Sequence, residues 1–306
     1  MNPSDVPTVD EVLSLDTEAL GPLRQPVLVV SLEGWFDMAG AATAAVEALF
    51  EPDRRLTIGE IDCDPFYDFT VERPMIETVD GTLRTIRWPR NQVDVWRAPD
   101  ESGRDVVILL GVEPHLGWRT YCDAIRTVAE RTGCSVVATV GAGAEQVPHT
   151  RSPFVTGSST NRSLARRLGL GAPSYQGMTG TVGVLHTVLE AAGIASVSLR
   201  VGIPHYLSNA SHPLAVAALQ RHLSHVLGVG PGADLDDEIT RHRSLHDEVV
   251  AADAQLAMYV TMLEREFDRR AEAAIPSAED LGAELEAFLA ELDDGGSEDE
   301  GPTSTS

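Results

Sequence analysis

The chain has 306 residues and a mean hydropathy of −0.06, values typical of a globular protein that can bury one sizeable core. Its formal net charge of −24 argues against nucleic acid or an anionic membrane surface as the main partner, since both require a concentrated basic patch. All 23 basic residues are arginine, which excludes a Walker A lysine and a pyridoxal phosphate Schiff base, and we expect no bound cofactor.

The first 25 residues are predicted to be an irregular lead-in, because Pro3, Pro7 and Pro22 interrupt them. The opening sequence, MNPSDVPTVDEVLSLD, is acidic and lacks the basic and apolar segments of a signal peptide. No apolar run approaches the roughly 20 residues that span a bilayer. Three scattered cysteines are too few for a disulfide framework or a zinc site. We therefore expect a cytoplasmic protein with no membrane contact and no bound metal ion.

Strands and helices alternate after the lead-in. Strands are expected at 27–33, 56–62, 82–88, 93–97, 105–111, 135–141 and 196–202. Helices are expected at 38–50, 117–131, 160–169, 177–192 and 214–227, and a Gly/Pro/Ser-rich connector at 141–160. Near-continuous apolar strands separated by helices indicate a mostly parallel sheet covered on both faces, which is a three-layer α/β/α domain over 26–230.

The two short strands at 82–88 and 93–97 alternate in polarity and are expected to pair as a hairpin at the sheet edge. They carry Trp88 and Trp96, which is more aromatic surface than a solitary edge usually exposes. Because an open sheet edge invites pairing, we predict a homo-oligomer with apolar contacts.

A second region follows the helix stop GVGPG at 228–232. The last 76 residues of the chain hold 21 acidic residues and five arginines, so this region is far more acidic than the rest of the chain. Apolar residues at helical spacing predict one long helix or a bent pair over 234–271. A capping box at Ser277–Asp280 opens a short acidic helix, so the extension is predicted over 231–294. Residues 295–306 are predicted to be a disordered acidic tail.

Five motifs together resemble the proteasome assembly chaperone two family, in its actinobacterial branch with a C-terminal helical extension. They are GWFDMAGAA, ILLGVEPHLGW, GAGAEQVPHTR, YQGMTGTVGVL and VGIPHYL, and the resemblance covers about residues 26 to 292. It implies a three-layer fold similar to nucleoside phosphorylases, homo-oligomers, and a chaperone or scaffold role with a protein partner. Family members that act on proteasomes commonly end in a hydrophobic–tyrosine–any tripeptide. This chain ends in Ser304-Thr305-Ser306 instead, so the proteasome role does not carry over directly.

The turn after the first strand is a candidate ligand site. Asp37 opens a helix whose first turn is nearly all small residues, so its bare N–H groups could hold an anion. Alternatively, Asp37 only caps the helix, and Gly40 only lets helix and strand pack closely. Glu113 and His115 follow the strand at 105–111 and could form an acid/base pair, or a plain turn around Pro114.

The connector after the strand at 135–141 could form an anion nest with Arg151 as a second clamp, or could be a mobile loop. The carboxyl ends of parallel strands lie at one edge of a sheet, so we predict that one cleft is lined by Trp35, Asp37, Glu113, His149, Arg151 and His205. The candidate ligand-binding residues are Gly34, Trp35, Asp37, Gly40, Glu113, His149, Arg151, Tyr175 and His205. No catalytic residue is assigned.

The histidine pairs His222/His225 and His242/His246 have helical spacing but no evident third ligand, and we do not interpret them as metal sites. The sequence therefore favours a non-enzymatic assembly chaperone or scaffold. The alternative is an enzyme of hydrolase or phosphorylase type that acts on a small polar or anionic substrate. Convergence of the strand-end residues on one pocket would distinguish the two.

Overall fold

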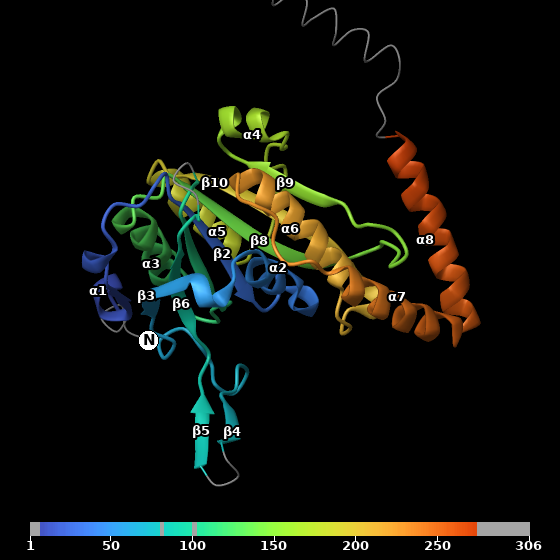
Figure 1. The fold of residues 1–306 in the computed structure, drawn as a ribbon, viewed down its shortest axis with the longest axis horizontal. Coiled ribbons are helices and arrows are strands. Elements are labelled where there is room, and N and C mark those ends of the chain that lie inside the picture. The colour runs from blue at the N-terminus through green and yellow to red at the C-terminus, as the bar shows by residue number, and fades with distance from the viewer. Residues whose placement is uncertain (1–6, 80–82, 100–102, 274–306) are drawn as a thin grey trace, which may run out of the picture. The chain divides into compact units, whose positions relative to one another are not determined.

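An eight-stranded mixed sheet forms the centre of the fold (Figure 1). The computed structural model describes residues 7–79, 83–99 and 103–273, in two compact units, Met1–Ala252 and Asp253–Ser306. The strands are β1 (Leu13–Leu15), β2 (Val27–Glu33), β3 (Arg55–Ile61), β4 (Met75–Val79), β5 (Leu83–Arg87), β6 (Asn91–Trp96), β7 (Val106–Val112), β8 (Val136–Glu145), β9 (Val155–Ser159) and β10 (Ala195–Pro204). The helices are α1 (Val9–Val12), α2 (Ala41–Leu49), α3 (Trp118–Arg131), α4 (Arg162–Leu168), α5 (Thr181–Ala191), α6 (Pro213–Leu227), α7 (Asp236–Ala251) and α8 (Ala254–Ala273).

The strand order is β1-β3-β6-β7-β2-β8-β10-β9. Within this order β7, β2, β8 and β10 are adjacent and parallel to one another. The remaining neighbouring pairs are antiparallel. Because β3 is two antiparallel steps from β7, it runs in the same direction as those four strands. Five of the eight strands therefore share one direction, which confirms the mostly parallel sheet.

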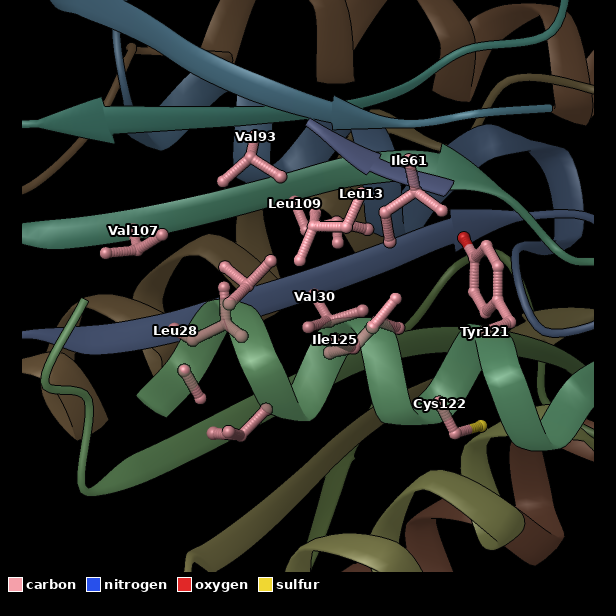
Figure 2. Packing of buried hydrophobic residues seen from close by; sticks show 14 of the residues in the cluster. Leu13, Leu28, Val30, Ile61, Val93, Val107, Leu109, Tyr121, Cys122 and Ile125 are labelled. Atoms are coloured by element: carbon pink, nitrogen blue, oxygen red, sulfur yellow. The ribbon is translucent and has the colours of Figure 1, made fainter. Parts of the chain in front are cut away.

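Helices cover both faces of the sheet, as the buried residues of β2 illustrate. Leu28 and Val30 belong to the core under α3 and α5. Val27 and Val29 point the other way, into the core under α2 and α6. Figure 2 shows the first of these cores, where Ile125 of α3 meets the strand side chains. Each fully buried aliphatic side chain contributes about 1.5–3 kcal/mol, so both layers are needed for stability.

The chain leaves the adjacent strands β2 and β7 towards opposite faces of the sheet. The connection after β2 enters α2 on one face, and the connection after β7 enters α3 on the other. Such a switch point opens a crevice at the carboxyl ends of the two strands, where α/β proteins bind ligands.

Two of the sequence predictions for the sheet were wrong. Residues 83–87 pair with β4 and not with residues 93–97, because β6 lies inside the sheet between β3 and β7. Trp96 is accordingly buried, and the aromatic edge that suggested self-association does not exist. The connector predicted over 141–160 begins as strand, since β8 continues to Glu145 in register with β10, and it ends in β9.

The lead-in and the domain boundary also differ from the prediction. The segment before residue 26 contains α1 and β1, because β1 pairs with the edge of β3 and the side chains of Val12 and Leu13 are buried there. The first unit extends beyond 230 and includes α7, where His246 and Val250 are buried. The predicted pair of helices over 234–271 corresponds to α7 and α8. The predicted helix after Ser277 and the tail 295–306 lie outside the described residues. Within the described ranges, every helix is too short or too polar to cross a bilayer.

Candidate functional site

The N-terminus of α2 is occupied by the protein's own carboxylate. Asp37 is buried, and its Oδ1 accepts a hydrogen bond from the Ala42 N–H at 2.6 Å. Its Oδ2 accepts from the Thr43 N–H at 3.2 Å and from the Thr43 hydroxyl at 2.5 Å. Burial raises the pKa of Asp37, and these hydrogen bonds oppose the shift. Asp37 therefore caps α2, and its carboxylate takes up the Ala42 and Thr43 N–H groups, as in the alternative interpretation in which Asp37 only caps the helix.

Gly40 has a conformational role here. Its φ is +65°, and a Cβ at this position would contact nothing within 4 Å. The residue is therefore required by its left-handed backbone and not, as the alternative interpretation held, by close packing of helix and strand.

Replacing Asp37 by alanine is expected to lower the free energy of unfolding by about 1–2 kcal/mol, because two N–H groups at the start of α2 lose their acceptor. Asp37→Asn keeps one acceptor oxygen and should lose less. Urea unfolding followed by circular dichroism measures both. Equal stability of Asp37→Ala and the wild type would show that another group caps α2.

Glu113 closes a second helix N-terminus and ties two loops together. Its Oε2 accepts from the Trp35 N–H at 3.2 Å, and its Oε1 accepts from the N–H of Thr181, the first residue of α5, at 3.4 Å. Gly34 has a φ of +134°, and a Cβ there would lie 3.0 Å from the Glu113 Cβ, so only glycine allows this approach. His115 is also engaged, since its Nδ1 accepts from the Asp68 N–H at 3.1 Å. Glu113 and His115, which the sequence suggested as an acid/base pair, therefore accept hydrogen bonds from backbone N–H groups.

An open hollow of about 900 Å³ lies at the carboxyl ends of β2 and β7, and we call it the strand-end hollow. Its rim carries the most exposed large apolar side chains that the structure describes in the first unit, with exposed fractions of 83% for Trp35, 75% for Tyr175 and 94% for Met178. Polar atoms at the rim are bonded internally: the Trp118 indole N–H donates to the Pro114 carbonyl, and the Tyr175 hydroxyl donates to the Met178 carbonyl. Exposed apolar surface gathered around a concave site is typical of a binding surface for other molecules.

His149 lies elsewhere, together with the buried His212 and His246, in a small cluster that we call the histidine cluster. Its ring bonds the Tyr206 hydroxyl through Nδ1 at 2.8 Å and the Asp247 carboxylate through Nε2 at 3.0 Å. The cluster consists of His149, His212, His242 and His246 with Tyr206 and Asp247. A cavity of about 30 Å³ beside it, also lined by Arg151, has room for about one water molecule.

The contacts of His212, His242 and His246 could not be predicted from the sequence, because the residues that they meet lie mainly on other elements. The only signal was the i, i+4 spacing of the last two on α7. Among the described residues, the ligand atoms of these histidines do not converge as a metal site would require; only Asp62, Cys63 and Asp64 do so. Burial, followed by the two adjacent aspartates, raises the pKa of the Cys63 thiol to about 11.

The six residues predicted to share one cleft are divided among four places. Trp35 and Glu113 line the strand-end hollow, with Gly34 and Tyr175. His149 and Arg151 belong to the histidine cluster and its cavity. Asp37 caps α2 beside Gly40, and His205 is exposed, with its Nδ1 bonded to the Glu145 carbonyl.

The reason for this division is the unequal length of the strands. The register that pairs Ser31 with Val140 places the end of β2 level with Ala142 of β8. β8 continues three residues further, which is about 10 Å, and β10 runs alongside it to Pro204. Residues 141–145 are extended strand paired with β10, and the Ala142 N–H donates on the other side to the Phe36 carbonyl at 2.6 Å, so this segment forms no anion nest. The loop that follows begins beyond the hollow.

The PAC2 family model matches residues 31–245 of the chain. Among solved structures, a PAC2 family protein of Streptomyces avermitilis is 34% identical, with a TM-score of 0.70, and the match covers 77% of this chain and 99% of that one. A proteasome-assembly chaperone homologue of Mycobacterium tuberculosis is 39% identical, with a TM-score of 0.68 and coverage of 76% and 99%. A second M. tuberculosis protein, of unknown function, is 26% identical, with a TM-score of 0.73 and coverage of 86% and 90%. No curated protein is detectably similar.

Proposed function

Since this chain belongs to the PAC2 family, we propose that it is a non-enzymatic assembly chaperone or scaffold, which works as a homo-oligomer and binds proteasome subunits. The observation that carries this proposal is the strand-end hollow, whose rim exposes Trp35, Tyr175 and Met178. A relative that is 39% identical is described as a proteasome-assembly chaperone homologue, which supports the choice of partner.

The rim is held in place before any partner arrives. Glu113 links the Trp35 loop to the start of α5, and the Tyr175 hydroxyl donates to the Met178 carbonyl within the loop that precedes α5. Preorganisation lowers the entropic cost of binding. Covering each of these three side chains would contribute about 1.5–3 kcal/mol. The fitting partner is therefore an apolar segment of another protein.

The groups inside the hollow favour binding over catalysis. Glu113 and His115 are titratable, and both accept hydrogen bonds from backbone N–H groups. An enzyme of hydrolase or phosphorylase type would need such groups directed at its substrate. A strand-end hollow with an apolar rim serves a protein partner better than a small polar or anionic substrate.

The proposal is tested with the purified proteasome α and β subunits of the organism that encodes this chain. Wild-type protein should bind one of them in calorimetry, and the Trp35→Ala/Met178→Ala variant should bind at least tenfold more weakly. Leu56→Ala removes an exposed apolar side chain from β3, outside the hollow, and should change affinity less than twofold. All three proteins should melt alike, because the substituted side chains are exposed.

Two outcomes would contradict the proposal. Wild-type protein could bind neither subunit, or the hollow variant could bind as well as the Leu56→Ala control. Turnover or a large thermal shift with a small polar compound, lost in the hollow variant, would instead favour the enzyme.

A further inference from the structure

One side-chain atom of the histidine cluster has no hydrogen-bond partner within the described part of the chain. His246 is only 7% exposed, and its Nε2 is buried without a partner. The hydrogen bond from His246 to the Ser211 backbone therefore uses Nδ1, so Nε2 of the neutral ring is an acceptor that meets no donor. His246 lines the cavity of about 30 Å³ beside the cluster. Because buried polar atoms are rarely left unpaired, Nε2 marks this cavity as a site for a small ligand.

The N-terminus of α6 lies at the same cavity. This helix has 15 residues, His212 before it provides no side-chain cap, and Pro213 has no N–H group. The Ala215 N–H donates to the His212 carbonyl at 2.9 Å, whereas the Leu214 N–H has no acceptor among the described residues. Leu214 and Ala215 both line the cavity. The cavity therefore meets the positive end of a helix together with an N–H group that lacks an acceptor, an arrangement that binds anions.

The charges around the cavity indicate the same class of ligand. Its lining includes Arg151, Arg243 and the four histidines of the cluster, and none of the described lining residues is an acid. Arg243 donates to the Thr150 carbonyl at 3.2 Å, and it forms no ion pair in the part of the chain that the structure describes. In a chain whose net charge is −24, such a lining is exceptional, and it attracts an anion and repels a metal ion.

We propose that the cavity binds a small inorganic anion of the size of chloride, held by the N-terminus of α6 and by Nε2–H of a protonated His246. The proton comes from solvent, so each anion enters with one proton and the charge of the cavity does not change. The volume has room for about one water molecule, so a monatomic anion fits and phosphate or sulfate does not. With His246 neutral, its Nε2 lone pair accepts from a water molecule instead. The site is independent of what the strand-end hollow binds.

Protonation of His246 is unfavourable unless an anion enters with the proton. Burial, then the charges of His212, His149 and His242, lower its pKa to about 4. The other charged or titratable groups of the cluster and its cavity are Tyr206 after β10, Arg151 after β8, and Arg243 and Asp247 on α7. Asp247 is bonded to His149 at 3.0 Å. A bound anion offsets the positive charges, so it raises the pKa of His246. Affinity for the anion should therefore rise about tenfold per pH unit of acidification between the two pKa values.

The test measures chloride binding to the full-length protein from the broadening of the chloride NMR line at about pH 6.5 and about pH 5.5. Sodium gluconate, whose anion is too large for the cavity, keeps the ionic strength constant. The apparent dissociation constant of chloride should be roughly tenfold lower at the lower pH. Urea unfolding at about pH 5.5 should show a more stable protein in chloride than in gluconate, because the anion binds only the folded chain.

Two pairs of variants separate the site from the general charge of the protein. His246→Phe should lose the pH-dependent binding, whereas His225→Phe, at an exposed position of α6 outside the cavity, should bind like the wild type. Arg243→Gln should raise the dissociation constant at least threefold and keep its pH dependence. Arg241→Gln removes an exposed arginine of the same helix that does not line the cavity, and should change the constant less than twofold.

Three results would overturn the proposal. Chloride and gluconate could act alike at about pH 5.5, which would mean that the cavity holds water only. Chloride could bind equally at both pH values, or His246→Phe could bind it as the wild type does. These variants leave the strand-end hollow intact, so their binding of proteasome subunits should be unchanged, and failure of this site is distinguishable from failure of the proposed function.

Discussion

Replacing Asn91 by alanine is expected to lower the free energy of unfolding by about 3 kcal/mol, through a lost network and a cavity. Asn91 is buried, and its Oδ1 accepts from the hydroxyls of Tyr67 at 2.8 Å and Tyr121 at 2.9 Å. The same oxygen accepts from the Val112 N–H at 3.1 Å. Burial raises the pKa of both tyrosines, which keeps them as protonated donors. Alanine leaves the Val112 N–H without its acceptor, and it leaves the two tyrosine hydroxyls with only the Val112 carbonyl, which is 2.6 Å from that of Tyr67 and 3.4 Å from that of Tyr121.

The same substitution should weaken partner binding, because Val112 is followed by Glu113 at the base of the strand-end hollow. Gln92→Ala is the matched control. The Gln92 amide is partly exposed and bonds Thr57 and Asp94, so we expect a loss below about 1 kcal/mol. Urea unfolding and calorimetry against the proteasome subunits give both quantities. An Asn91→Ala protein as stable as the Gln92→Ala protein would show that the tyrosines find other acceptors.

Acidification from pH 6.5 to pH 4 is expected to destabilise the first unit, by at most about 3 kcal/mol through His246. His246 is buried, and its ring centre lies 4.8 Å from that of His212 and 5.8 Å from that of His149. Burial, then the charges of His212, His149 and His242, lower its pKa to about 4, against a hydrogen bond to the Ser211 backbone. The unfolded chain therefore binds a proton in this window that the folded chain does not.

The sign of the effect follows from this difference in bound protons. Stability from His246 is fully present above about pH 6.5 and is lost as the pH falls towards 4. Burial also lowers the pKa of His186 to about 4, which adds a loss in the same direction. Asp37 and Glu33 act in the opposite direction, because burial raises the pKa of both carboxyl groups. Asp247, Arg151 and Arg243 are the charged neighbours of the cluster.

A histidine substitution isolates the contribution of the cluster. His246→Phe keeps a ring of similar size and should reduce the slope of the unfolding free energy against pH between pH 6.5 and 4, while His186 and His212, whose pKa values burial also lowers, keep their contributions. His225→Phe replaces an exposed histidine on α6 and should leave the slope as in the wild type. Guanidinium unfolding at several pH values measures both slopes. If His246→Phe and the wild type have the same slope, the histidine cluster is not the acid-sensitive element.

The sequence by itself determined the fold class and most of the helices and strands of this protein, but not α1, β1, β4 or β9. β2 spans the predicted residues 27–33, and α3 and α6 begin within one residue of the prediction. Apolar runs, helical periodicity and glycine stops are local signals, so they can be recognised without knowledge of the fold. The alternation of buried strands and helices then left few ways to pack them other than three layers.

Only the tertiary structure decided which strands pair and how the site residues are grouped. Glu113 reaches Trp35 and Thr181, which are 78 and 68 residues away in the sequence, and His149 reaches Asp247, which is 98 residues away. Contacts between such distant residues produce no periodic pattern in the sequence, so they could not be predicted from it. The lengths of β8 and β10 beyond the end of β2 separate the histidine cluster from the strand-end hollow, and strand ends are set by pairing between distant segments, which no local pattern encodes.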